Sequence, residues 1–135
     1  MTAPAQGKDR TILLLDDDTN TLLVLHTILE RTAARILECA NEPCAVQHCE
    51  AFSRSIDLLV ADVVLQDSNG PAVARKVKQL QPDMRLLYIS GFSLPELQRR
   101  GLLSSQQMSP GAVEFLQKPF SSEQFLNHVN KLLPN

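Results

Sequence analysis

Short apolar runs alternate with stretches of helical spacing along most of the chain. The clearest run, at residues 12–15, is followed at once by three carboxylates, Asp16, Asp17 and Asp18. A continuous apolar run of this length, bounded by polar residues, is typical of a strand buried on both faces. Comparable runs predict five strands in total, at residues 12–15, 36–39, 58–61, 86–89 and 113–116, of which 36–39 is the weakest.

The stretches between these runs carry apolar residues at the spacing of amphipathic helices. Each set shares one helix face, which can cover a sheet. The sets are Leu22, Leu25 and Leu29; Ala45, Cys49 and Phe52; Val73, Val77 and Leu80; and Phe125, Val129 and Leu132. Strands that alternate with helices in this way predict an α/β fold.

The last helix has the most complete start signal. Ser121 and Gln124 have the spacing of a capping box, in which each side chain satisfies the other residue's backbone N–H. Phe120 and Phe125 flank this box at the spacing of a hydrophobic staple. A weaker signal of the same kind predicts a short helix over residues 93–101, ending near a glycine.

Composition limits the classes of protein to consider. A length of 135 residues suits one domain, and we expect residues 10–135 to form it and residues 1–9 to form a disordered tail. A net charge of −2, one Tyr and no Trp argue against direct binding of nucleic acid. No stretch has the length and hydropathy of a secretory or membrane-spanning segment, so we expect a cytoplasmic protein.

Cysteine and histidine do not indicate a metal or catalytic site. The odd number of cysteines argues against a closed disulfide framework, and their spacing does not match a zinc ribbon or finger. We expect them to be small buried hydrophobic residues. The histidines share no spacing with the acids, and ordinary roles on helices or at the surface are expected. These residues are Cys39, Cys44, Cys49, His26, His48 and His128.

The carboxylates after residues 12–15 are crowded where the strand leaves the core. Two carboxylates ~4 Å apart repel by about 4 kcal/mol at an effective dielectric constant of 20. Such a pair takes up a proton or recruits a cation. The simpler alternative is a solvated strand end followed by acids that cap a helix. Asp18 followed by Thr19 fits that cap better than a metal site, whereas Asp16 and Asp17 are candidates for binding a cation.

Polar residues also follow the other predicted strands. The third strand ends at Asp62, the fourth at Ser90, and the fifth continues through Gln117 into Lys118. In open α/β sheets, ligands bind outside the carboxyl ends of the strands, so these side chains should converge with Asp16 and Asp17. Carboxylates, a hydroxyl and an ammonium group together suit phosphoryl chemistry, because they can hold a divalent cation, attack phosphorus and neutralise phosphoryl oxygens.

Four sequence blocks resemble the receiver domain of two-component response regulators. They are ILLLDD at residues 12–17, DLLVAD at 57–62, YISG at 88–91 and FLQKPF at 115–120. The four blocks in this order and at this spacing are specific for the family, although each block alone is weak evidence for the resemblance. The segments SGF at 90–92 and RGLL at 100–103 are most similar to receivers attached to hybrid sensor histidine kinases. The resemblance implies a (βα)5 flavodoxin-like fold, a doubly wound five-stranded parallel sheet of strand order 2-1-3-4-5.

The resemblance also implies site roles. Asp62 would be the phosphoacceptor. Mg²⁺ would be coordinated by Asp17, Asp62 and the backbone carbonyl of Val64, with Asp16 acting through water. Lys118 would pair with the phosphoryl group.

Switching would involve two further residues. Ser90 would hydrogen-bond to the phosphoryl group in the active state, and the ring of Phe115 would move inward as Ser90 does so. The changed surface would be that of the fourth helix, the fifth strand and the last helix. The Lys118–Pro119 peptide bond would be cis, as is usual in the family.

The chain departs from the family pattern after Asp62. Gln66 and Asp67 stand where the family usually has Pro and Gly. Val64 stands at a position that often influences hydrolysis of the acyl phosphate. The loop over residues 102–110 is longer than usual.

These features predict a phosphorelay signalling switch rather than a turnover enzyme, with no output domain in this chain. A histidine kinase or histidine phosphotransfer protein would be its phosphodonor, a further protein would receive its output, and it would be a monomer or weak dimer. One alternative is a small phosphatase of haloacid-dehalogenase type using Asp16 and Asp18, although Asn20 does not match that motif. A second is a degenerate receiver that acts only as a binding module.

Overall fold

The computed structural model describes residues 10–51 and 55–133. The predicted tail at residues 1–9 and the predicted helix-face residue Phe52 lie outside the described residues. The elements are β1 (Thr11–Leu15), α2 (Thr19–Leu29), β2 (Arg35–Cys39), α3 (Glu42–Ala51), β3 (Leu58–Asp62), α4 (Gly70–Leu80), β4 (Arg85–Ser90), α5 (Leu94–Arg99), η1 (Ser105–Gln107), β5 (Val113–Gln117) and α6 (Ser122–Leu132).

The strands form one sheet in which every neighbouring pair is parallel. The order is β2-β1-β3-β4-β5, which places β1, β3 and β4 in the middle. All five strand predictions and the predicted strand order are therefore confirmed. The edge strand β2 is the least buried, with two of its five residues exposed, which explains why its apolar pattern was the weakest.

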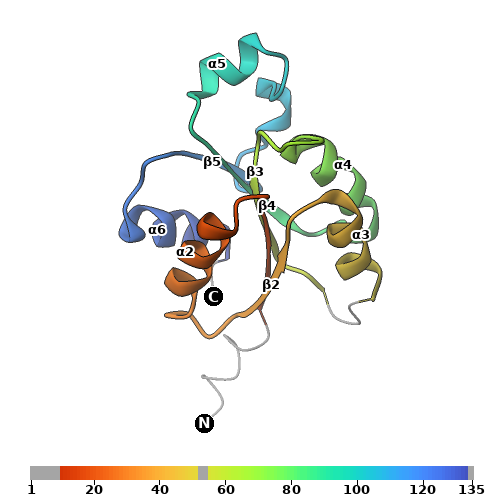
Figure 1. Cartoon of the computed structure of the whole chain (residues 1–135), viewed down its shortest axis with the longest axis vertical. Helices are drawn as coiled ribbons and strands as arrows, with labels where there is room; N and C mark the ends of the chain where they lie inside the picture. The colour runs from red at the N-terminus through yellow and green to blue at the C-terminus, as the bar shows by residue number, and fades with distance from the viewer. Residues whose placement is uncertain (1–9, 52–54, 134–135) are drawn as a thin grey trace.

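Helices cover both faces of the sheet, with α2 and α6 on one side and α3 and α4 on the other (Figure 1). Side chains alternate between these faces along β1. Leu13 and Leu15 pack into the core that includes residues of α3, α4 and α5. Ile12 and Leu14 pack into the core formed with α2 and α6. This burial on both sides is why the strand is continuously apolar.

The predicted start of α6 is confirmed. The hydroxyl of Ser121 accepts a hydrogen bond from the backbone N–H of Gln124 at 3.0 Å, and the side chain of Gln124 accepts one from the N–H of Ser121 at 2.8 Å. The rings of Phe120 and Phe125 stack with their centroids 5.8 Å apart. The cap satisfies backbone donors while the ring pair fixes the direction of the chain entering the helix.

Two features differ from the predicted pattern. Leu80, expected on the buried face of α4 with Val73 and Val77, is 40% exposed at the last position of the helix. Residues 105–107 form a short 3-10 helix inside the predicted loop, which Ser104 caps together with Gln107. No helix in the described part of the chain has the length and apolar character needed to cross a membrane.

Gly70, the first residue of α4, lies against the backbone of the last residue of β3. A Cβ atom at this position would be 2.4 Å from the carbonyl oxygen of Asp62. The N–H of Gly70 donates to the carbonyl of Val63 at 2.8 Å, which closes the loop between the two elements. A side chain would have to displace either the helix or the strand end, so the close approach requires glycine.

Replacing Gly70 with alanine is expected to reduce the free energy of unfolding by about 1–3 kcal/mol, the usual effect of overpacking a tight site. Gly91→Ala is the matched control, because a Cβ atom there would meet nothing within 4 Å. Urea unfolding of both variants measures the difference. Equal stability of the two variants would contradict the close approach at Gly70.

Candidate functional site

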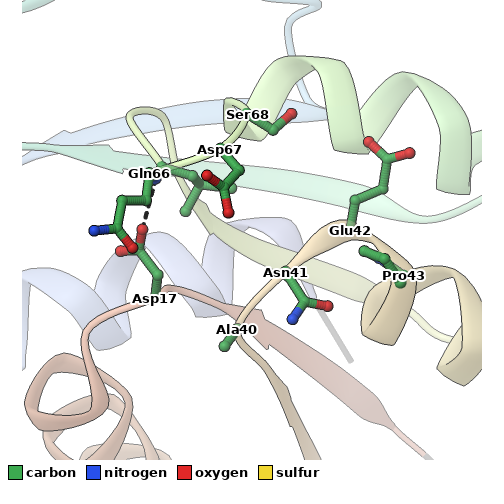
Figure 2. Close-up of a pocket in the computed structure, with 9 residues that line it drawn as sticks. Asp17, Ala40, Asn41, Glu42, Pro43, Gln66, Asp67 and Ser68 are labelled. Atoms are coloured by element: carbon green, nitrogen blue, oxygen red, sulfur yellow. Dashed lines mark hydrogen bonds between the residues drawn. The ribbon is translucent and has the colours of Figure 1, made fainter.

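A cavity of about 620 Å³ lies beside the carboxyl ends of the first three strands (Figure 2). Its lining comes from the loops after β1, β2 and β3, and includes Asp17, Asn41, Glu42, Gln66 and Asp67. The other predicted site residues are not among its lining. Asp17 is therefore the predicted site residue that borders the cavity.

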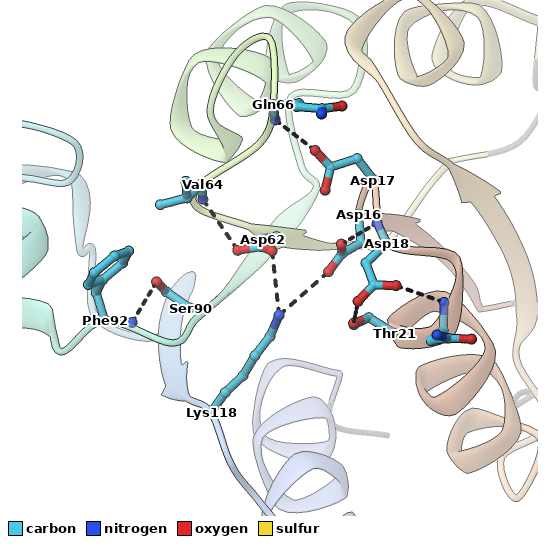
Figure 3. A network of polar contacts seen from close by, with 11 residues as sticks. Asp16, Asp17, Asp18, Thr21, Asp62, Val64, Gln66, Ser90, Phe92 and Lys118 are labelled. Carbon is cyan, nitrogen blue, oxygen red and sulfur yellow. Dashed lines mark hydrogen bonds and ion pairs between the residues drawn. The ribbon is translucent and has the colours of Figure 1, made fainter.

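The strand ends bring four of the predicted site residues together (Figure 3). Asp16 follows β1, Asp62 ends β3, and Lys118 follows β5. The Nζ atom of Lys118 is 3.4 Å from Oδ2 of Asp62 and 3.8 Å from Oδ2 of Asp16. Ser90, the last residue of β4, lies at the same edge. One ammonium group therefore faces two carboxylates that come from neighbouring strands.

Burial makes these two carboxylates difficult to ionise. Asp16 is 2% exposed, and desolvation by burial raises its pKa from 3.8 to about 6. Desolvation likewise raises the pKa of Asp62, although the charge of Lys118 and the N–H of Val64 act in the opposite direction. Because Lys118 is one cation shared by two acids, the site still favours added positive charge.

Backbone N–H groups hold the carboxylates of the site in place. Oδ1 of Asp16 accepts a hydrogen bond from the N–H of Asp18 at 2.9 Å, and Oδ1 of Asp62 accepts one from the N–H of Val64 at 3.3 Å. Oδ2 of Asp17 accepts one from the N–H of Gln66 at 2.7 Å. Val64 itself is 40% exposed. These donors are main-chain groups, so no sequence motif identifies them.

Ser90 is buried, and its hydroxyl oxygen accepts a hydrogen bond from the backbone N–H of Phe92 at 3.0 Å. A hydroxyl that accepts in this way still has its own proton to donate. Phe115 is half-buried on β5 and packs against the core that includes α3, α4 and α5. The Lys118–Pro119 peptide bond is cis, as the resemblance implies.

The oxygen donors at this edge suit a hard divalent cation. Mg²⁺ is usually bound by one or two carboxylates, with waters in its other positions. Asp16 and Asp62 are carboxylates whose pKa values are raised first by burial and further by the charge of nearby acids. In residues 10–51 and 55–133, no group of three acidic, His or Cys side chains is arranged to hold a metal ion by itself. Asp17 points to Gln66 (Figure 3).

The residues expected to have ordinary roles do have structural partners. Asp18 caps α2 by accepting from the N–H of Asn20 at 3.0 Å, which confirms that prediction. Cys39 and Cys49 are buried and Cys44 is half-buried. The ring of His26 pairs with Glu38, that of His128 pairs with Glu114, and that of His48 contacts the carbonyl of Glu38. Arg99 and Arg100 are exposed and pair with Glu96.

The sequence of this chain matches the model of the response regulator receiver domain over residues 12–130. This match extends over most of the chain and includes the predicted site residues and every strand except the first residue of β1. The chain therefore belongs to the response regulator receiver domain family, and the resemblance inferred from its four sequence blocks is confirmed.

Relatives include both large and small proteins. The sensor kinase CckA of Brucella abortus is 26% identical over 123 residues, which are 91% of this chain but 12% of the kinase. The receiver protein CpdR of the same species is 25% identical over 124 residues, covering 92% of this chain and 97% of CpdR. The crystal structure of the receiver domain from the hybrid histidine kinase CckA has a TM-score of 0.71 at 24% identity, covering 90% and 98% of the two chains.

These matches confirm the predicted similarity to receivers of hybrid sensor kinases. Family membership does not favour the phosphatase alternative, and the geometry of Asp18 agrees. Its two carboxylate oxygens accept hydrogen bonds from the N–H of Asn20 and the hydroxyl of Thr21 at the start of α2. Because the Asp18 carboxylate caps the helix in this way, it is not positioned to act as a general acid beside Asp16.

The raised pKa of Asp16 makes stability depend on pH. The folded state binds this proton more tightly than the unfolded chain, so the contribution of Asp16 is favourable below pH ~4 and is lost as the pH rises through about 6. We expect Asp16→Asn, in EDTA at pH 7, to be more stable than wild type by an amount on the order of 2 kcal/mol.

Urea unfolding from pH 4 to pH 8 measures this difference between variant and wild type. The advantage of Asp16→Asn should become small near pH 4, where wild-type Asp16 is protonated in the folded state and the unfolded chain, with a pKa of 3.8, has begun to bind the proton. An advantage that does not change with pH would contradict the role of burial in the titration of Asp16.

Proposed function

We propose that the chain is a phosphoacceptor switch of a two-component phosphorelay and that Asp62 carries the phosphoryl group. The observation that carries this proposal is the position of the Asp62 carboxylate, partly buried at the end of β3 and 3.4 Å from the ammonium group of Lys118. A buried carboxylate paired with a fixed cation is suited to attack phosphorus, because the cation can neutralise the oxygens of the incoming phosphoryl group.

The proposed donor is the phosphohistidine of a histidine kinase or histidine phosphotransfer protein. A carboxylate oxygen of Asp62 attacks the phosphorus and forms the new O–P bond as the P–N bond breaks. The electron pair of that bond returns to the imidazole nitrogen of the donor. Lys118 lies beside Asp62 and compensates the negative charge on the transferred group.

Mg²⁺ would be held by Asp17, Asp62 and the carbonyl of Val64, with Asp16 acting through water. When bound, it supplies positive charge that shields the acids and polarises the phosphoryl oxygens. The donor set supports this assignment, since carboxylate and carbonyl oxygens are the ligands that Mg²⁺ prefers. Burial raises the pKa values of Asp16 and Asp62, and the charges of neighbouring carboxylates raise them further, so a cation bound here would favour the ionised acids.

Switching would follow from competition for the hydroxyl of Ser90. Its oxygen accepts from the N–H of Phe92, and turning the hydroxyl toward a phosphoryl group on Asp62 would change this loop. The loop leads directly into α5, and Cζ of Arg100, the residue that follows α5, lies 4.3 Å from the centre of the Phe92 ring. Inward movement of Phe115 would extend the change across the surface of α5, β5 and α6, which a downstream protein partner would recognise.

Incubation with acetyl phosphate and Mg²⁺ is expected to add one phosphoryl group to the wild-type protein and none to Asp62→Asn. Intact-protein mass spectrometry measures the addition. Asp67→Asn is the matched control, because it removes an exposed acid in the neighbouring loop and should be labelled like wild type. Equal labelling of Asp62→Asn and wild type would contradict the role of Asp62 as phosphoacceptor. Asp16→Asn is tested in the same way, and a loss of labelling in this variant alone would favour the phosphatase alternative.

Mg²⁺ is expected to raise the melting temperature of the wild-type protein near pH 7, because it binds the folded state and relieves repulsion between the acids. When the Mg²⁺ concentration is one hundred times the dissociation constant, binding raises the free energy of unfolding by about 2.7 kcal/mol. Asp17→Asn should lose most of this shift. Asp18→Asn should keep it, since Asp18 caps α2. An undiminished shift in Asp17→Asn would contradict the proposed coordination.

A further inference from the structure

Asp17 is the one proposed metal ligand that is bound to a neighbouring loop instead of facing Lys118. Its Oδ2 atom accepts a hydrogen bond from the backbone N–H of Gln66 at 2.7 Å, across a separation of 49 residues in sequence. The distance is short for a bond between an amide and a carboxylate, as charge-assisted hydrogen bonds are. The bond ties the end of β1 to the loop that follows β3 (Figure 3).

The loop that supplies this donor is ordered by its own contacts. The N–H of Leu65 donates to the carbonyl of Ser68 at 3.2 Å, which forms a turn with Gln66 inside it. Val64 and Asn69 form an antiparallel bridge at the base of the turn. The N–H of Gln66 is therefore presented to Asp17 by a fixed turn that also includes the backbone of Val64.

The surroundings leave Asp17 able to change partners. Asp17 is exposed, whereas Asp16 is buried. It borders the cavity of about 620 Å³, so its carboxylate is not packed against other side chains on that side (Figure 2). Asp17 also lies near enough to Asp16 and Asp62 to raise the pKa of both acids. A modest rotation would exchange the amide of Gln66 for a cation beside those acids.

We propose that Gln66 is a positioning residue whose backbone N–H competes with Mg²⁺ for the carboxylate of Asp17. This proposal rests on the proposed function, in which Asp17 is a metal ligand. The hydrogen bond stabilises the metal-free arrangement, so it lowers the affinity for Mg²⁺. Binding of Mg²⁺ weakens the bond and detaches the turn from Asp17, which connects occupancy of the metal site to the contact between the end of β1 and the loop after β3.

The competing group is the main-chain N–H, so the side chain at position 66 is not required. Any residue except proline supplies this donor, because proline has no N–H. Gln66→Ala keeps the donor and removes the side chain, whereas Gln66→Pro removes the donor. Comparison of these two variants therefore isolates the hydrogen bond to Asp17.

Isothermal titration with Mg²⁺ at pH 7 measures the dissociation constants of the wild-type protein and both variants. Gln66→Pro is expected to bind Mg²⁺ about three- to tenfold more tightly than Gln66→Ala, as expected from removing a competing hydrogen bond of ordinary net strength. Gln66→Ala should bind within about twofold of wild type. Equal or weaker binding by Gln66→Pro would overturn the proposal.

A second measurement uses the wild-type protein and does not depend on how Pro is accommodated in the loop. The Gln66 amide, observed by ¹⁵N–¹H NMR, should be protected from solvent exchange without Mg²⁺ and lose protection as Mg²⁺ saturates the protein. Protection that remains unchanged at saturation would show that the bond does not compete. Wild-type protein that binds no Mg²⁺ would overturn the proposed metal site as well, whereas normal Mg²⁺ binding without the Gln66 effect overturns only this proposal.

Discussion

The ammonium group of Lys118 lies between the buried carboxylate of Asp16 and the partly buried carboxylate of Asp62, and the properties of the site follow from this unequal pairing of charge. Lys118 is 3.8 Å from Asp16 and 3.4 Å from Asp62. One cation cannot fully compensate two acids in a poorly solvated position, which is why burial raises the pKa of both. Such a site gains from a divalent cation, and its excess of negative charge makes an added phosphoryl group a large electrostatic change.

The fold brings these charges together at the carboxyl edge of a parallel sheet. Asp16 follows and Asp62 ends a strand whose apolar residues are buried on both faces, so the core fixes their positions, and Lys118 follows the neighbouring edge strand β5. Gly70 contributes in another way, because it lets α4 begin against the carbonyl of Asp62. The loop between them is therefore short and closed, and it places the backbone of Val64 beside Asp62.

Much of this arrangement could be predicted from the sequence because it depends on patterns along the chain. Apolar runs identified the strands, and Ser121 with Gln124 identified the start of α6. The hydrogen bond from Gln66 to Asp17 could not be predicted, because its donor is a backbone group that every residue but proline has. The exposure of Leu80 could not be predicted, because helical spacing assigns a residue to a helix face but does not show how well that face is covered at the end of the helix.

The central claim is that the reactive atom belongs to Asp62 and not to the acids after β1. Reduction of the phosphorylated protein with borohydride tests it most directly, because an acyl phosphate on aspartate is converted to homoserine at the phosphorylated residue. Peptide mass spectrometry after treatment with acetyl phosphate and Mg²⁺ is expected to place homoserine at position 62. Homoserine at Asp16 or Asp17, or at no acid of the sheet edge, would contradict the account.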